Sequence, residues 1–174
     1  MRLFHVAHDR FAELSELPPS LPPGGFVWIG TTRDEFTVRQ ADIQARLHAW
    51  MGAQIVDLHV SDLLNPHLPS HYDYTSWYDL LVFRRLSAGT VALEEGLADG
   101  GLATRTRRAL AAIETSAVGF AVFDRVLLTV HPGDCTVRDY FAQRLAETTS
   151  ATEARGIARM PASPADLMLR MVNH

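Results

Sequence analysis

The stretch GFVWIGTTRDEF, residues 25–36, decides the fold class because it joins a strand signal directly to a helix signal. Its first part, residues 26–32, is a short and almost wholly apolar run of the kind that favours a strand. A strand of this composition is typical of one that other elements cover on both faces, as in the middle of an α/β sheet. The stretch therefore predicts a buried strand that leads straight into a helix.

The segment that follows, residues 33–50, predicts that helix. Phe36, Ile43 and Leu47 recur at helical spacing, so they would form one apolar stripe along it. Two acidic residues lie in the first turn, where they complement the positive end of the helix dipole. Gly52 lies just beyond the last turn, where a glycine commonly ends a helix.

The remainder of the chain alternates strand and helix signals, which predicts one α/β domain over residues 1–174. We expect strands at Arg2–His8, Ala53–His59 and Ser76–Leu86 and in a hairpin over Ala117–Val130. Further helices are expected at Val137–Glu147 and Ser163–His174, with a single helical turn at Ser61–Asn65. The other segments are a proline-rich connector at Leu17–Gly25, a glycine-rich loop at Ser87–Ala103 and a helix by propensity at Arg105–Glu114.

The last of these helices has a strong beginning and no end signal. Ser163 can cap it, Pro164 suits the first helical position, and Asp166 can complete a capping box. No stop residue precedes His174, so residues 163–174 are expected to be the start of a truncated helix.

Composition excludes several classes of protein. The chain is 47% hydrophobic and 21% charged, which is typical of a globular domain. Its net charge of −4 argues against a nucleic-acid partner, which usually requires a basic patch. The N-terminus MRLFHVAHDR lacks the apolar core of a signal peptide, and no apolar run approaches the ~18 residues of a membrane helix. Taken alone, the chain is expected to be soluble.

The stretch NPHLPSHYDY, residues 65–74, raises the question of a metal site, because His67 and His71 lie four apart. Such a pair binds metal well when a helix places both rings on one face. Pro66 and Pro69 exclude a helix across this pair, so the interpretation favours histidines of an extended or turning lead-in to the following strand. Metal ligation remains the alternative.

No other cluster of residues predicts a catalytic site. The carboxylates Asp57, Asp62, Asp73 and Asp79 could offer hard oxygen ligands to Mg²⁺, although a single carboxylate is more often a cap or a solvated surface group. Cys135 is the single cysteine and is interpreted as a small buried hydrophobe. The pair Arg84–Arg85 is interpreted as solvated or acid-paired charge. We therefore expect no enzyme activity, no catalytic residues and no firmly bound cofactor.

Three longer stretches stand in a recognisable order: GFVWIGTTRDEF, then HVSDLLNPHLPSHYDYTSWYDLLVFRRL, then VGFAVFDRVLLTVHPGD. In this order they resemble the cytoplasmic N-terminal domain of the CorA-type magnesium/cobalt transporters, which are related to the ZntB zinc transporters. The final SPADLMLRMVNH resembles the start of the helix that precedes the long stalk of that family. The resemblance covers roughly residues 24–174.

The resemblance implies a three-layer α/β/α domain with a mixed central sheet, and a regulatory or sensor role. The full-length protein would lie at the cytoplasmic face of the bacterial inner membrane, with its own membrane domain and the other subunits of a homopentamer as partners. By this resemblance a divalent ion (Mg²⁺, Zn²⁺ or Co²⁺) would bind weakly between subunits. The candidate ligands, chosen for their residue types and not by the resemblance, are Asp62, Asp73, Asp79, His67 and His71.

The resemblance also implies limits. The stalk, the membrane helices and the Gly-Met-Asn pore loop of the family are missing, so the chain is expected to be an excised or truncated domain that associates weakly and conducts no ions. Where some members hold a regulatory Mg²⁺ after the long strand, RRLSAGTV contains no acidic residue. In the family the segment equivalent to Arg105–Glu114 is generally extended.

Two other functions stay open at this point. A metal-dependent hydrolase would use His5, His8, His67 and His71 with nearby aspartates, and it requires those histidines to converge in one pocket. A plain protein-interaction module would have no ion role.

Overall fold

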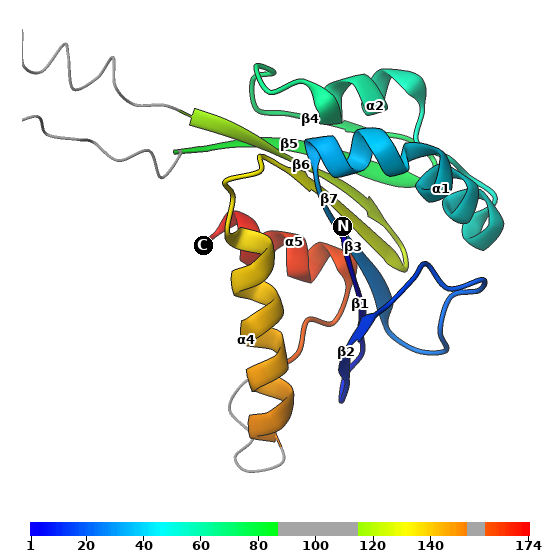
Figure 1. The fold of residues 1–174 in the computed structure, drawn as a ribbon, viewed down its shortest axis with the longest axis vertical. Helices are drawn as coiled ribbons and strands as arrows, with labels where there is room; N and C mark the ends of the chain where they lie inside the picture. Colours follow the sequence, from blue (N-terminus) through cyan, green and yellow to red (C-terminus); the bar gives the residue numbers. More distant parts are fainter. Residues whose placement is uncertain (87–114, 153–158) are drawn as a thin grey trace, which may run out of the picture.

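The computed structural model describes residues 1–86, 115–152 and 159–174 (Figure 1). The predicted loop at Ser87–Ala103 and the segment Arg105–Glu114 lie outside the described residues. The strands are β1 (Arg2–Val6), β2 (Phe11–Leu14), β3 (Phe26–Thr32), β4 (His71–Tyr74), β5 (Tyr78–Leu86), β6 (Thr115–Phe123) and β7 (Val126–His131). The helices are α1 (Arg33–Met51), α2 (Asp57–Leu64), α4 (Val137–Thr152) and α5 (Pro164–Val172).

The described strands form one mixed sheet in the order β2-β1-β3-β7-β6-β5-β4. The neighbours β3 and β7 run parallel, and the other neighbouring pairs run antiparallel. Helices α1 and α2 cover one face of the sheet, and α4 and α5 cover the other (Figure 1). The predicted three-layer α/β/α fold with a mixed sheet is confirmed.

The strand and helix of the opening stretch lie where the sequence placed them. Strand β3 is buried on both faces: Ile29 packs into the core beneath α1, and Trp28 packs into the core beneath α4 and α5. Thr32 caps α1 in a capping box with Glu35, whose side chain accepts a hydrogen bond from the Thr32 amide. Gly52 ends the helix in the left-handed conformation, at φ 70°.

The strand predicted at Ala53–His59 is wrong, because helix α2 already begins at Asp57. The segment before the helix is nevertheless extended in its burial pattern, since Ala53 and Ile55 are buried between exposed neighbours. The side-chain amide of Gln44, however, takes the place of a neighbouring strand. Its Oε1 accepts from the Ile55 amide at 2.9 Å, and its Nε2 donates to the Ile55 carbonyl at 2.7 Å. The turn predicted at Ser61–Asn65 is the last turn of α2.

Two short edge strands, β2 and β4, have no counterpart among the predictions. Each has four residues and pairs on one side only within the described sheet. The structure confirms the strand predicted at Ser76–Leu86, which is β5, and the hairpin over Ala117–Val130, which is β6 and β7. It also confirms helices α4 and α5, and Ser163 caps α5 as expected. Helix α5 ends at Val172 rather than continuing to the last residue. Cys135 is buried, as expected of a small hydrophobe.

Candidate functional site

Three of the five predicted metal-ligand candidates lie around the corner where helix α2 meets the edge strand β4. Asp62 lies on α2, and His71 and Asp73 lie two apart on β4, so their side chains share the sheet face that α2 covers. The corner therefore combines carboxylates with imidazoles, a ligand set that suits several divalent ions.

A buried histidine that sequence reasoning placed in a strand organises this corner. His59 of α2 is 3% exposed and lies between Tyr78 and Asp73. Its Nδ1 is 2.8 Å from the Tyr78 hydroxyl oxygen, and its Nε2 is 3.0 Å from Asp73 Oδ2. The Val56 amide donates to the same hydroxyl oxygen at 3.0 Å. The three hydrogen bonds are compatible when the Tyr78 hydroxyl donates a hydrogen bond to Nδ1 and the Nε2–H group of His59 donates one to the Asp73 carboxylate.

The hydrogen bonds that run from Tyr78 through His59 to Asp73 are called the relay below, and the electrostatics of the relay follow from these contacts. The hydrogen bond from His59 lowers the pKa of Asp73, and the bond from the Tyr74 amide lowers it further. Burial raises the pKa of Tyr78, although the bond from the Val56 amide opposes that shift. Both shifts keep Asp73 ionised and Tyr78 neutral at physiological pH, which is the state that the relay requires.

Asp62 and His71 form a second pair across the same corner. Asp62 Oδ2 is 3.5 Å from His71 Nε2, and His71 Nδ1 donates to the Pro69 carbonyl at 3.2 Å. Two histidine–aspartate pairs therefore connect α2 to β4. The signal that could have revealed them is the spacing within each element, since His59 and Asp62 lie three apart on the helix while His71 and Asp73 lie two apart on the strand.

The other two candidates do not join this corner. Asp79 pairs with Tyr74 on the opposite face of the sheet, where it accepts a hydrogen bond from the Tyr72 hydroxyl at 2.9 Å. The alternation of side chains along a strand forces this separation from Asp73. His67 lies exposed in the loop before β4, where its backbone amide donates to Asn65 Oδ1.

Within residues 1–86, 115–152 and 159–174, no three histidine, cysteine or acidic side chains are arranged to hold one metal ion. The corner offers pairs of ligands, and each pair is already joined by its own hydrogen bond or ion pair. A divalent ion bound there would have to take further ligands from elsewhere.

The histidines of the hydrolase alternative are scattered. His5 lies on β1 and donates to the Gly24 carbonyl at 2.9 Å, and His8 lies exposed in the turn after that strand. His71 lies on β4, at the far edge of the sheet, with four strands between it and β1. Since these groups cannot converge in one pocket, the proposed hydrolase site is wrong.

A charged network that sequence reasoning missed lies where the parallel strands β3 and β7 end. Helices α1 and α4 leave these strand ends toward opposite faces, and Glu35 pairs there with the N-terminal ammonium group and with Arg138, at 3.2 Å. Burial alone would raise the pKa of Glu35, but these charges and the bond from the Thr32 amide outweigh it and lower the pKa. The capping-box spacing of Thr32 and Glu35 was its visible signal.

This network fills the position where open α/β sheets commonly bind ligands, at the carboxyl ends of strands whose helices diverge. Here the chain supplies its own carboxylate, since Glu35 lies in the first turn of α1 and pairs with Arg138 in the first turn of α4. Gly30 lets Arg138 pack closely over β3, since a Cβ at that position would lie 2.7 Å from the arginine side chain. The arrangement joins the two helical layers through ion pairs.

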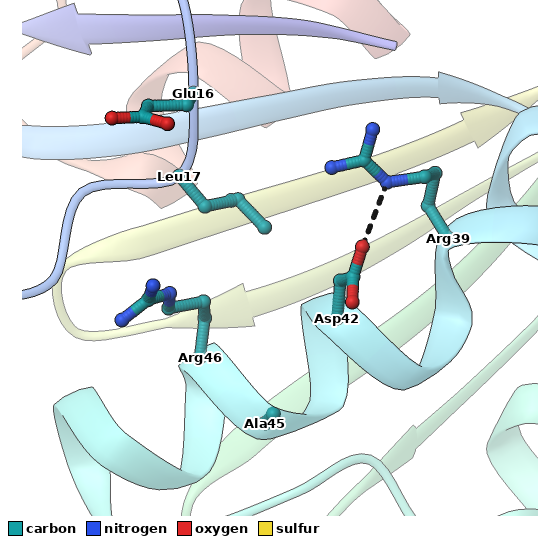
Figure 2. A pocket seen from close by; sticks show the side chains of 6 residues that line it. All are labelled: Glu16, Leu17, Arg39, Asp42, Ala45 and Arg46. Carbon is teal, nitrogen blue, oxygen red and sulfur yellow. Dashed lines mark ion pairs between the residues drawn. The ribbon is translucent and has the colours of Figure 1, made fainter.

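A shallow pocket of about 350 Å³ lies beside α1 and the segment after β2 (Figure 2). Arg39 and Asp42 form an ion pair at 3.1 Å on the side of the pocket that α1 forms, and Arg46 comes from the same helix. Glu16 comes from the segment after β2, which forms the other side. Because charges of both signs line this pocket, it offers no preference for a ligand of either charge.

Comparisons with known proteins show the fold of the chain. No known protein family and no curated protein matches the sequence. Among solved structures, the cytoplasmic domain of ZntB from Vibrio parahaemolyticus RIMD 2210633 matches 99% of this chain with a TM-score of 0.59 and 11% identity. The full-length CmaX protein matches 99% of the chain with a TM-score of 0.55 and 12% identity.

The chain spans about half the length of these proteins, since it covers 56% of the ZntB chain and 45% of the CmaX chain. Identities this low establish the likeness of the fold alone. The fold is the one that the CorA and ZntB resemblance implied. In the described part of the chain, no helix combines the length and the apolar character needed to cross a membrane.

Proposed function

We propose that this chain is the cytoplasmic regulatory domain of a CorA-like transporter of divalent cations, and that it senses an ion rather than catalysing a reaction. The observation that carries this proposal is the likeness of 99% of the chain to a ZntB cytoplasmic domain. The full-length protein would lie at the cytoplasmic face of the bacterial inner membrane. Its partners would be its own membrane domain and the neighbouring subunits of a homopentamer.

The geometry of the candidate ligands supports an ion that is shared between subunits. Asp62, Asp73 and His71 line one face of the sheet edge, Asp79 lies on the other face, and His67 is exposed nearby. One subunit supplies pairs of these groups, and Mg²⁺ usually takes one or two carboxylates and keeps several of its waters. A second subunit or retained water would complete the coordination. Co²⁺ and Zn²⁺ would also accept the imidazoles.

Such a site would regulate the assembly through charge repulsion between adjacent subunits, which the bound ion removes. Without the ion, carboxylates of adjacent subunits repel each other, and the ion removes this repulsion and favours the closed assembly. The size of the response is set by the difference between the affinities of the closed and open states for the ion. This mechanism predicts that the isolated domain binds the ion weakly.

The proposal is tested with the complete gene product, reconstituted in vesicles. We expect a divalent-cation flux that rising Mg²⁺ on the cytoplasmic side inhibits. The double variant Asp62→Asn/Asp73→Asn should require a several-fold higher Mg²⁺ concentration for the same inhibition, while the matched control His8→Asn, on an exposed turn, should not. A gene that encodes no long charged helix, apolar spans or Gly-Met-Asn loop after codon 174 would instead support an interaction module.

A further inference from the structure

The hairpin of β4 and β5 presents a group of exposed aromatic side chains at the edge of the sheet. Tyr72 and Tyr74 of β4 are 61% and 69% exposed, and Trp77, in the turn that joins the two strands, is 60% exposed. In the described part of the chain, the other exposed aromatic side chain is Tyr140 of α4. A local group of this kind is typical of an interaction site, whereas single exposed apolar residues are ordinary. Residues 72–79 are called the aromatic hairpin below.

The two tyrosines of the aromatic hairpin lie on one face of the sheet. They are two apart on β4, so they share the face opposite to that of His71 and Asp73. Their rings are stacked, with the centroids 6.2 Å apart and 25° between the planes. The Tyr72 hydroxyl donates to Asp79 Oδ1 at 2.9 Å, and this bond raises the pKa of Tyr72. The phenol therefore keeps its proton, and the ring pair is held beside a carboxylate.

The turn of the aromatic hairpin is also held in place by hydrogen bonds. The Thr75 hydroxyl oxygen accepts from the amides of Trp77 and Tyr78, both at 3.1 Å. The Thr75 amide donates to the Tyr78 carbonyl at 2.9 Å. Because the backbone is ordered before a partner arrives, binding loses less conformational entropy.

The outer edge of β4 does not favour the addition of another strand. The Thr75 amide points toward β5, so the alternation of an antiparallel pair turns the Tyr74 amide outward. That amide donates to Asp73 Oδ1 at 2.8 Å, while Asp73 Oδ2 is bonded to His59. A partner is therefore held by the side chains of the aromatic hairpin rather than by extension of the sheet.

The charge of the aromatic hairpin favours a cationic partner. The hairpin contains Asp73 and Asp79 and no arginine or lysine. Asp124, which is exposed, follows Phe123, and Phe123 pairs with Tyr78, so a third carboxylate lies at the same end of β5. Aromatic faces attract cations. A planar guanidinium can both stack on such a face and form paired hydrogen bonds with a carboxylate, which an ammonium group cannot.

From the stacked rings, the carboxylate beside them and the absence of basic residues, we infer that the aromatic hairpin docks an arginine-bearing segment of a partner protein. The guanidinium stacks on the rings of Tyr72 and Tyr74 and pairs with Asp79. Tyrosine, tryptophan and arginine are the residues that most often dominate the energetics of protein interfaces. The inference does not rest on the proposed sensor function, because no metal ion takes part in it.

The experiment is a titration of the ¹⁵N-labelled chain, followed by two-dimensional NMR, with a short peptide in which arginine alternates with glycine. EDTA is present, so that no divalent ion occupies Asp79. We expect saturable shifts of the amides of residues 72–79 and of the Trp77 indole. The indoles of Trp28 and Trp50 are hydrogen-bonded within the fold and should not shift.

Two further peptides separate stacking from simple charge attraction. A peptide with lysine in place of arginine should bind several-fold more weakly, because an ammonium group lacks the plane that stacks on the rings. A peptide with citrulline, which has the shape of arginine and no charge, should not saturate.

Variants of the chain complete the test. Tyr74→Leu should lower the affinity for the arginine peptide about fivefold, whereas Tyr74→Phe keeps the ring and should retain the affinity. Asp79→Asn should weaken the binding of the arginine and lysine peptides alike. The matched control Tyr140→Leu removes an exposed aromatic side chain of α4 and should change nothing.

Several results would overturn the inference. Equal affinities for the arginine and lysine peptides would indicate charge attraction alone. Shifts centred outside residues 72–79, or an unchanged affinity in Tyr74→Leu, would place the binding elsewhere. Shifts of the hairpin signals that grow with the concentration of the chain alone would assign this surface to a second copy of the chain instead.

Discussion

His131 shows how burial sets the chemistry of one residue. It lies at the end of β7, only 2% exposed, and its Nδ1 donates to the Pro132 carbonyl at 2.9 Å. Among the described residues, its Nε2 finds no hydrogen-bond partner. Burial lowers the pKa of this imidazole, and the bond to Pro132 offsets the shift only in part. The folded chain therefore keeps His131 neutral under conditions in which an exposed histidine would be charged.

This environment predicts a loss of stability in mild acid. The unfolded imidazole takes up a proton near its ordinary pKa of 6.5, whereas the folded one does so only at lower pH. Stability is therefore fully present above pH 6.5 and falls as the pH drops toward the folded pKa, by at most about 1.4 kcal/mol per pH unit. Urea unfolding between pH 7.5 and 5.5 measures this slope.

The variant His131→Asn keeps a donor for the Pro132 carbonyl and removes the titrating group. We expect it to flatten the dependence of the unfolding free energy on pH, whatever its effect at pH 7.5. The control His8→Asn, on an exposed turn, should keep the original slope. An unchanged slope in the His131 variant would show that another group causes the acid sensitivity.

At the scale of the element, the connector before β3 depends on two neighbouring glycines with different surroundings. Gly24 and Gly25 both have positive φ, at 73° and 63°. A Cβ at Gly24 would meet nothing within 4 Å, whereas one at Gly25 would lie 2.0 Å from the Val6 carbonyl oxygen. The turn has little freedom to move, since Arg125 Nε donates to the Gly25 carbonyl at 3.1 Å.

These glycines form a matched pair for mutation. Gly24→Ala should lower the free energy of unfolding by about 1 kcal/mol, which is the steric penalty of the left-handed conformation. Gly25→Ala adds a backbone clash to the same penalty and should cost about 3 kcal/mol or more. Chemical denaturation of both variants tests the difference, and similar losses would contradict the close approach of Val6.

The relay through His59 predicts how firmly α2 is attached to the sheet. Tyr78→Phe removes the hydroxyl group that serves both Val56 and His59, and it leaves two polar groups without that partner. We expect a loss of about 1–3 kcal/mol in the free energy of unfolding and faster hydrogen exchange of the Val56 amide. Tyr74→Phe is the control, since this tyrosine is 69% exposed. Equal effects of the two variants would argue against the relay.

At the scale of the whole molecule, the described structure offers pairs of metal ligands and no complete set. We therefore expect the isolated domain to bind Mg²⁺, Co²⁺ or Zn²⁺ only weakly and to remain mainly monomeric, with a chelator leaving its thermal unfolding unchanged. Calorimetry measures the ion binding and the thermal unfolding, and sedimentation measures the oligomeric state. Tight binding of one ion per monomer would contradict a site shared between subunits.

The central elements of this protein were predictable because their signals are local. The apolar run of β3, the stripe of α1 with its glycine stop, the hairpin of β6 and β7 and the serine cap of α5 can all be read within a few residues. The layered fold follows from this alternation of strands and helices. The order of three longer stretches also pointed to the fold that the solved structures share.

The tertiary structure alone decided the features that depend on distant partners. Strands of four residues, such as β4, carry little local signal and form because a longer neighbour pairs with them. Gln44 replaces a neighbouring strand at Ile55, and His59 meets Asp73 only because α2 packs on the sheet edge. A hollow between strands β5 and β6 and the ends of α4 and α5 likewise forms only when these four elements pack together. Periodicity describes which face of an element is apolar, but it does not specify what that face will contact.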